Sequence, residues 1–257
     1  MARTVAPKPR RKATKTPPVV RAQRIELVDD AGQVRVQLAV RPDGKPGMAF
    51  QDPNGKARIL VGIPEDGAVT LSLLDRRGRR RAALGVMAEG GATLTLVDGN
   101  GKGHALLTVT ADGDTGLGLG DIQGMGRALL SVHRTGAVSL SLFDKTGRRR
   151  NGLALRTDGT PTLILEDAEG KGRVHLTVSP TGEPGLGMGD RAGSGRVLLG
   201  VRADDSAGVA FYDGQGKLRA VLGMTAVPVS GAGSETAEPA SALALFDRDG
   251  NLLHQVP

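Results

Sequence analysis

The chain of 257 residues contains no cysteine, no tryptophan and only five aromatic residues. The absence of cysteine excludes a disulfide scaffold and a cysteine-ligated zinc or iron–sulfur centre. So few aromatic rings exclude a base-stacking platform and an aromatic sugar-binding cleft. Apolar runs long enough for a signal peptide or a membrane span are also missing, because glycine or a polar residue recurs every few positions. We therefore expect a soluble, cytoplasmic protein without a transmembrane segment.

Positive charge is concentrated at the start of the chain. The formal net charge is +7, yet residues 1–24 carry eight Lys and Arg and no acid, so the rest of the chain has a net charge of −1. Four prolines among these basic residues favour a disordered tail over residues 1–23, which cannot bury enough apolar surface to offset the entropy of ordering. A flexible polycation binds nucleic acid or an anionic membrane surface without sequence preference; the alternative is a solubilising or targeting leader. The candidate anion-binding residues of the tail are Lys8, Arg10, Arg11, Lys12 and Lys15.

Beyond residue 23 the chain repeats with a period of 23 residues. An aspartate marks each unit, a glycine follows it three residues later, and the sixth residue after the aspartate is basic. Nine units on one lattice indicate a repeat architecture in which each unit packs against its neighbours. The marking aspartates are Asp29, Asp52, Asp75, Asp98, Asp121, Asp144, Asp167, Asp190 and Asp213.

Each unit holds two short runs in which aliphatic residues alternate with Thr, Ser, Ala or Gly. This period of 2 predicts strands with one buried face, whose opposite face suits solvent exposure or the close approach of a second sheet. The turn Asp52-Pro53-Asn54-Gly55 predicts a hairpin, because its Asp bonds the backbone, its Pro fixes φ and its Gly accepts a positive φ. We therefore expect an all-β antiparallel meander of about 18 to 20 strands. The alternative is a parallel β-solenoid, whose coils also often have a period in the low twenties.

A second, 69-residue period, equal to three units, lies over the first. Residues 116–121 match residues 185–190, and the Gly-Arg-Arg-Arg sequence at 78–81 recurs at 147–150. Either three hairpins complete one turn of a triangular prism, or a 69-residue gene segment was triplicated without a geometric consequence. We expect a single β-repeat domain over residues 24–257, with an insertion at 228–240 and a C-terminal cap at 241–257.

Several sequence features resemble a group of bacterial β-repeat proteins without an established activity. They are the Asp-x-x-Gly-(Lys/Arg)-x-Arg turns, the start Arg24-Ile-Glu-Leu-Val-Asp29, and the final segment around Asp247. That group usually begins with a hydrophobic signal or anchor segment, whereas this sequence begins with basic residues. The resemblance implies a bacterial origin and supports the repeat boundaries, and it implies no catalytic residue.

No residue pattern in the chain indicates catalysis or a cofactor. The repeated aspartates suit Asx-turns and lack the acidic spacing of a calcium loop. The four histidines occupy different places in the unit, and no serine breaks the repeat as a nucleophile with its own partners would. We therefore expect no enzyme activity, no metal and no cofactor.

Two basic turns are candidates for an anion-binding edge. If three hairpins formed one turn of a prism, both clusters would lie together as one patch that receives phosphates or an acidic partner. The alternative is a solvated edge that prevents aggregation between sheets. The residues are Arg76, Arg77, Arg79, Arg80 and Arg81 in one turn and Lys145, Arg148, Arg149 and Arg150 in the other.

These features predict a non-enzymatic structural or interaction protein, with a rigid β-repeat body and a basic flexible tail. Its expected partner is a second copy or another protein. The alternative is a sequence-independent binder of nucleic acid, another polyanion or an anionic membrane surface, through residues 3–24 and the arginine-rich edge.

Overall fold

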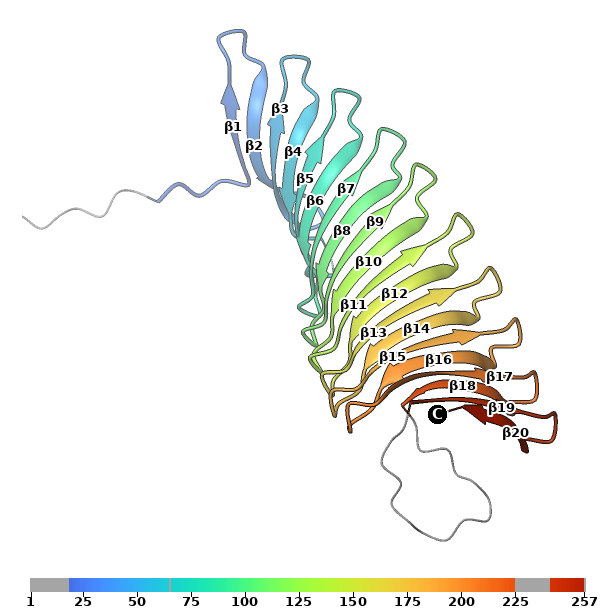
Figure 1. Ribbon diagram of the computed structural model, residues 1–257. Coiled ribbons are helices and arrows are strands. Elements are labelled where there is room, and N and C mark those ends of the chain that lie inside the picture. The colour runs from blue at the N-terminus through green and yellow to red at the C-terminus, as the bar shows by residue number, and fades with distance from the viewer. Residues whose placement is uncertain (1–18, 65, 225–240, 257) are drawn as a thin grey trace, which may run out of the picture.

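A computed structural model describes residues 19–64, 66–224 and 241–256 as one long, twisted, antiparallel β-sheet (Figure 1). Most of the expected basic tail and the whole expected insertion lie outside the described residues. The strands are β1 (Arg24–Val28), β2 (Val34–Val40), β3 (Pro46–Gln51), β4 (Ala57–Gly62), β5 (Val69–Leu74), β6 (Arg80–Val86), β7 (Ala92–Val97), β8 (Gly103–Val109), β9 (Thr115–Gly120), β10 (Gly126–Val132), β11 (Val138–Phe143), β12 (Arg149–Leu155), β13 (Pro161–Glu166), β14 (Gly172–Val178), β15 (Pro184–Gly189), β16 (Gly195–Val201), β17 (Ala207–Tyr212), β18 (Leu218–Met224), β19 (Ser241–Phe246) and β20 (Leu252–Val256).

Every strand pairs antiparallel with the strands next to it in the chain. β1 pairs only with β2 and β20 only with β19 among the described residues, so the sheet is open. The prediction of an all-β antiparallel meander is therefore confirmed, and the parallel alternative is wrong.

The triangular prism requires a correction. A prism would bring hairpins three units apart into contact, whereas the strands of the described chain contact only their sequence neighbours. The physical reason is that each tight turn returns the chain directly beside the preceding strand, which leaves no corner at which the sheet changes direction. The 69-residue period is therefore a similarity of sequence without a geometric turn.

Two kinds of turn alternate along the two edges of the sheet. We call the edge formed by turns such as residues 52–55 the Asp-turn edge, and the edge formed by turns such as residues 41–44 the Gly-turn edge. In both turns the glycine has a positive φ, +73° at Gly55 and +80° at Gly44, as the turn chemistry predicts. The backbone N–H of Gly55 donates to the carbonyl of Asp52 at 2.9 Å, and each Asp turn shifts the strand register at a bulge. These local contacts fix the hairpin geometry.

The sheet has a single layer, and this differs from the expected strands with one buried face. Ala68 and Ala244, 3% and 0% exposed, are the buried hydrophobic residues of the described chain. The aliphatic residues expected to form a core are half-exposed, because the described residues provide no second layer to cover them. A single sheet of this length thus lacks the two packed layers on which globular domains depend.

Candidate interaction surfaces

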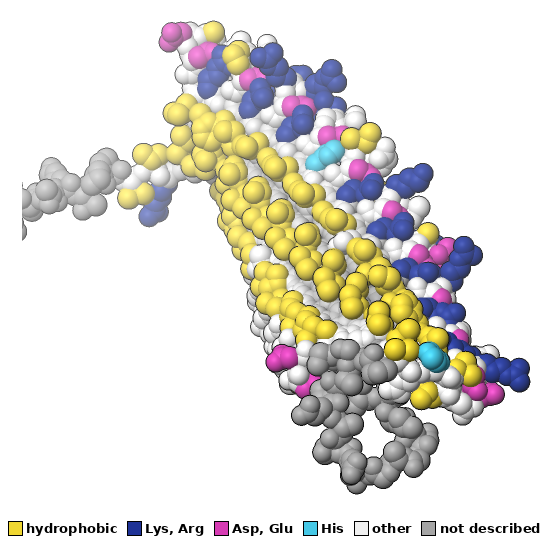
Figure 2. Space-filling model, viewed as in Figure 1, with side chains coloured by type: hydrophobic (Ala, Val, Ile, Leu, Met, Phe, Trp, Pro, Cys, Tyr) yellow, Lys and Arg dark blue, Asp and Glu magenta, His cyan; other side chains and the backbone are white. Residues whose placement is uncertain are grey.

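One face of the sheet carries an unbroken row of aliphatic side chains. Each strand contributes one residue, and each residue lies directly opposite the next across the ladder, so the row crosses all 20 strands. Figure 2 shows these hydrophobic side chains gathered in rows that run across the strands. We call them the central apolar row: Ile25, Leu38, Met48, Val61, Leu71, Leu84, Leu94, Leu107, Leu117, Leu130, Leu140, Leu153, Leu163, Leu176, Leu186, Leu199, Val209, Leu222, Leu243 and Val256.

Two further rows flank the central row on the same face. Residues two positions away, such as Leu96 and Leu119, form the row nearer the Asp-turn edge, where alanines such as Ala105 lie between them. Valines such as Val86 and Val109 belong to the row nearer the Gly-turn edge. The face is therefore a continuous apolar band of a size that soluble monomers seldom expose, which indicates an interaction surface.

The opposite face consists mainly of small and polar residues. Gly47, Gly62, Thr70, Gly85 and Thr93 follow one another across the strands in one of its rows. Glycine has no side chain to cover the backbone there. The side-chain layer on this face is therefore thinner than on the apolar face, and the surface is hollowed where glycines cluster.

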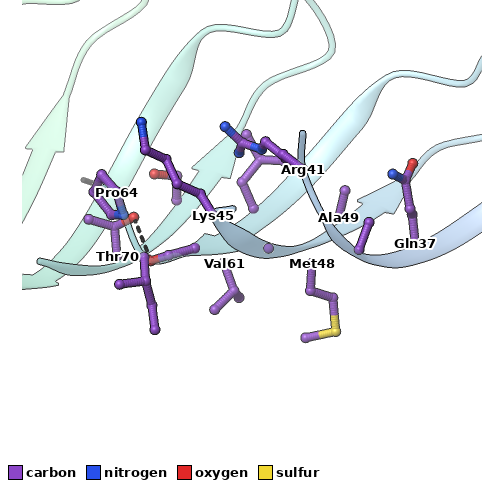
Figure 3. A pocket seen from close by; sticks show the side chains of 14 residues that line it. Gln37, Arg41, Lys45, Met48, Ala49, Val61, Pro64 and Thr70 are labelled. Carbon is purple, nitrogen blue, oxygen red and sulfur yellow. Dashed lines mark hydrogen bonds between the residues drawn. The ribbon is translucent and has the colours of Figure 1, made fainter. Parts of the chain in front are cut away.

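A hollow of about 360 Å³ on this face lies across β2 to β5 (Figure 3). Arg41 and Lys45 come from the turn at its border, whereas Met48 and Val61 point to the other side of the sheet in Figure 3. Its lining residues include two hydroxyl side chains and no acidic residue. The hollow therefore offers cations, hydroxyl groups and apolar surface.

A repeated network of Asp and Arg binds neighbouring hairpins together along the Asp-turn edge. The carboxylate of Asp121 accepts hydrogen bonds from the backbone N–H of Gln123 and Met125, both at 3.0 Å, and lies 3.2 Å from the guanidinium of Arg127. Arg127 also donates from Nε to the carbonyl of Phe143 in the next hairpin at 2.9 Å. In seven of the nine units the basic residue six positions after the aspartate donates in this way to a carbonyl of the next hairpin. The aspartate forms the expected Asx-turn.

This environment lowers the pKa of the turn aspartates. The backbone N–H of Arg79 is the main cause of the lowered pKa of Asp75. The hydroxyl of Thr146, followed by its backbone N–H, lowers the pKa of Asp144 from 3.8 to about 2. Hydrogen bonds to the ionised carboxylate stabilise its charged form, so these residues are negative at neutral pH.

The candidate anion-binding arginines divide into engaged and unengaged side chains. Arg79 pairs with Asp75, Arg81 donates to the carbonyl of Val97 at 3.0 Å, and Arg149 pairs with Glu166. Arg148 donates to the carbonyl of Ala168, while Arg150 donates to that of Glu166 at 3.0 Å and lies 3.6 Å from Asp144. Among these candidates, the side chains with no hydrogen bond or ion pair to the described part of the chain are those of Arg76, Arg77, Arg80 and Lys145.

The two basic clusters do not form the single patch expected from a prism. The first belongs to the turn between β5 and β6 and the second to the turn between β11 and β12. Both lie on the Asp-turn edge, but six strand spacings separate them by about 29 Å. The tail residues Lys8, Arg10, Arg11, Lys12 and Lys15 lie outside the described residues.

The described part of the chain contains neither a metal-binding group of side chains nor a membrane-spanning helix. No group of three or more His, Asp or Glu side chains could hold a metal ion there. His133, His175 and His254 are exposed, and His104 is half-buried at 3.4 Å from Asp98. The part of the chain that the structure describes also contains no helix with the length and apolar character that a membrane crossing requires.

Comparison with known proteins gives weak structural likenesses. No protein family and no curated protein matches the sequence. The TCP domain of Drosophila melanogaster SAS-4, solved with a proline-rich motif of Ana2, is similar at a TM-score of 0.40 and 13% identity, over 68% of this chain and 96% of that chain. The G-box domain of the microcephaly protein CPAP is similar at a TM-score of 0.32 and 11% identity, over 75% of this chain and 99% of that chain. We draw no functional conclusion from likenesses of this size.

Proposed function

We propose that the protein is a non-enzymatic structural or interaction protein, whose long sheet is a rigid platform with its apolar face covered by a second β layer. The observation that carries this proposal is the central apolar row, because all 20 strands contribute to it. An aliphatic side chain stabilises a protein when it is removed from water. An aliphatic residue at each of these positions would give no such stabilisation if the face were exposed to solvent alone.

The central apolar row is only partly buried in the isolated sheet. Leu130 and Leu153 of the central row are 44% and 50% exposed, so each leaves about half of its transfer free energy unrealised. A fully buried leucine contributes about 1.5–3 kcal/mol, and the band holds dozens of aliphatic residues. Covering the band therefore supplies the second layer on which a stable domain depends.

Thiol protection tests this proposal directly. The chain has no cysteine, so Leu130→Cys and Leu129→Cys each introduce a single thiol on adjacent residues of β10 that face opposite sides of the sheet. In the isolated sheet the two leucines are almost equally exposed, 44% and 39%. We expect a maleimide to label position 129 rapidly and position 130 at least tenfold more slowly in the native protein. Equal labelling rates would overturn the proposal, and labelling in denaturant is the control for intrinsic reactivity.

A second candidate function is sequence-independent binding of polyanions at the Asp-turn edge and the basic tail. The observation that favours it is the exposed Arg76, Arg77 and Arg80, whose side chains have no partner in the described chain. We expect deletion of residues 1–23 to abolish retention on a heparin column and the triple Arg→Ala variant at 76, 77 and 80 to lower the eluting salt concentration. Arg156→Ala with Arg202→Ala, on the Gly-turn edge, is the control. Unchanged retention in both test variants would exclude this function.

A further inference from the structure

The two long edges of the sheet carry opposite net charges. The ten Asp turns, from residues 29–35 to residues 247–253, hold 21 Lys and Arg against 13 Asp and Glu, a formal net charge of +8. The described residues of the eight Gly turns, from 41–45 to 202–206, hold five basic against nine acidic side chains, a net charge of −4. Figure 2 shows the Lys and Arg side chains concentrated along the edge of the Asp turns. The sheet is therefore an electrostatic dipole across its width.

From this dipole and the apolar band we infer that the second layer is a second copy of this chain, related by a twofold axis that runs along the sheet, between the two layers, and perpendicular to the strands. This inference rests on the proposed function. Each strand then lies over the same strand of the partner in the opposite direction, so the positive edge of each copy lies over the negative edge of the other. The other twofold arrangement, with the axis parallel to the strands, places like-charged edges over each other and reverses the ends of the sheet.

A second copy fits the band in length, spacing and area. Twenty strands about 4.8 Å apart make a band about 90 Å long, and three rows of side chains make it about 15 Å wide. Two copies would then bury about 2,700 Å² in total, within the range of obligate homodimers. A β-sheet partner, whose strands have the same spacing of about 4.8 Å, keeps its rows of side chains in step with this sheet, and a second copy is such a sheet with the same length.

The inferred arrangement also pairs individual turns. The most basic turn, residues 75–81, lies between β5 and β6 and would face the Gly turns on either side of these strands in the partner. Those turns carry Asp66 and Glu89. Residues 98–104 have no net charge, and they would face the turn that carries Asp112 and Asp114. The opposite charges of residues 75–81 and of the turns that face them favour the matched ends over the reversed ends.

The turn of residues 144–150 does not follow this pattern. In the inferred dimer it would face Gly turns that carry Arg134 and Arg156, so its positive charge stays uncompensated by the partner. The charges of the two edges are therefore complementary as sums over all turns. The complementarity between individual facing turns is strongest between β4 and β9.

Distances between spin labels distinguish the two arrangements. Ala31, Gln123 and Gln215 are exposed residues at the same place in three Asp turns, in the hairpins β1–β2, β9–β10 and β17–β18. Each single substitution to cysteine in the full chain gives one label per copy, away from the apolar face. With matched ends, all three labels lie about 25 Å from their counterparts, the width of the sheet and the gap between layers. With reversed ends, the same strand spacing places them about 85, 15 and 65 Å apart in a flat sheet.

The outcomes separate this inference from the function on which it rests. Three similar distances, each close to the width of the sheet, support the matched dimer. Three very different distances, longest at position 31, overturn it in favour of reversed ends. If no distance between labels on two copies is detected but the thiol at position 130 is protected, the second copy is overturned as the occupant. The proposal that a second layer covers the apolar face then still holds. An absence of distances with an unprotected thiol at position 130 refutes both.

Discussion

Leu129 and Leu130 are adjacent leucines of β10 whose side chains lie on opposite faces of the sheet, 39% and 44% exposed. Leu130 belongs to the central apolar row, and Leu129 lies across from Gly118 and Ser141 on the small-residue face. The two residues share a strand, a side-chain volume and nearly the same exposure. Truncating each to alanine therefore measures what covers each face in solution.

The expected magnitudes follow from burial. Removing three carbon groups at about 0.8 kcal/mol each, scaled by the roughly 60% that the isolated sheet buries, costs about 1.4 kcal/mol at either position. If a second layer covers the apolar face, Leu130→Ala becomes a core substitution that costs about 3–5 kcal/mol. Leu129→Ala stays near the lower value. The predicted difference between the two variants is thus about 1.6–3.6 kcal/mol.

Urea unfolding, followed by circular dichroism at several protein concentrations, measures this difference. For a dimer that unfolds to monomers the midpoint rises with protein concentration, and Leu130→Ala should lower the midpoint at every concentration. The adjacent pairs Leu106 and Leu107 in β8 and Leu198 and Leu199 in β16 provide two independent repetitions of the same comparison. Equal costs within each of the three pairs, with midpoints independent of concentration, would refute the reasoning.

Three further predictions concern the turns. Arg81→Ala should destabilise the protein by about 1 kcal/mol in urea unfolding, because it removes the hydrogen bond to the carbonyl of Val97. The control Arg80→Ala should change stability by less than about 0.5 kcal/mol, and equal effects of the two substitutions would contradict the structural role of Arg81. Asp205 has φ +61° where the other Gly turns have glycine, so Asp205→Gly should raise the melting temperature, a gain of about 0.5–1 kcal/mol, and a lowered melting temperature would contradict this. The lowered pKa of Asp144 stabilises the fold above pH 3.8, and this contribution is lost as the pH falls toward about 2; the stability of Asp144→Asn should therefore change less over that interval, and parallel acid titrations of the two proteins would refute this.

The hairpins were predictable from the sequence because their causes are local. Asp52 and Gly55 determine a turn through contacts within four residues, and the alternation of residues 69–73 determines which side chains share a face. The open meander then follows from the repetition of tight turns. The Asx-turn interpretation of the aspartates is confirmed for the same reason.

The number of layers and the course of the sheet were not predictable in this way. Alternation gives an apolar face, but the same pattern arises whether that face meets another part of the chain, another chain or water. The prism prediction took the 69-residue period of the sequence as a turn in space, although nothing in the residues near a turn distinguishes the third hairpin from the others. The candidate cluster that follows from it, Arg76 to Arg81 beside Lys145 to Arg150, was wrong as a single patch for that reason.

The opposite charges of the two edges were missed, although the sequence contains the signal. The basic turn residues Arg76, Arg77 and Arg80 belong to the turns that begin with the repeated aspartate, whereas Asp66 and Glu89 belong to the intervening turns. Summing the charge of the body as one quantity gives −1 and conceals this division. Summing each set of turns separately would have revealed it.

The last hairpin favours association through faces over association through edges. Arg219 donates to the carbonyl of Asp247 and so joins β18 to the hairpin of β19 and β20. The equivalent position after Asp247 is Leu253, 66% exposed, which has no hydrogen-bond donor for a further strand. His254 is the seventh residue after Asp247 and lies opposite Leu245. Most other units have an aliphatic residue or alanine at this seventh position. A strand added to β20 would lack the contact between hairpins and would meet the polar side chain of His254. The central apolar row, in contrast, continues without a break through Leu243 and Val256.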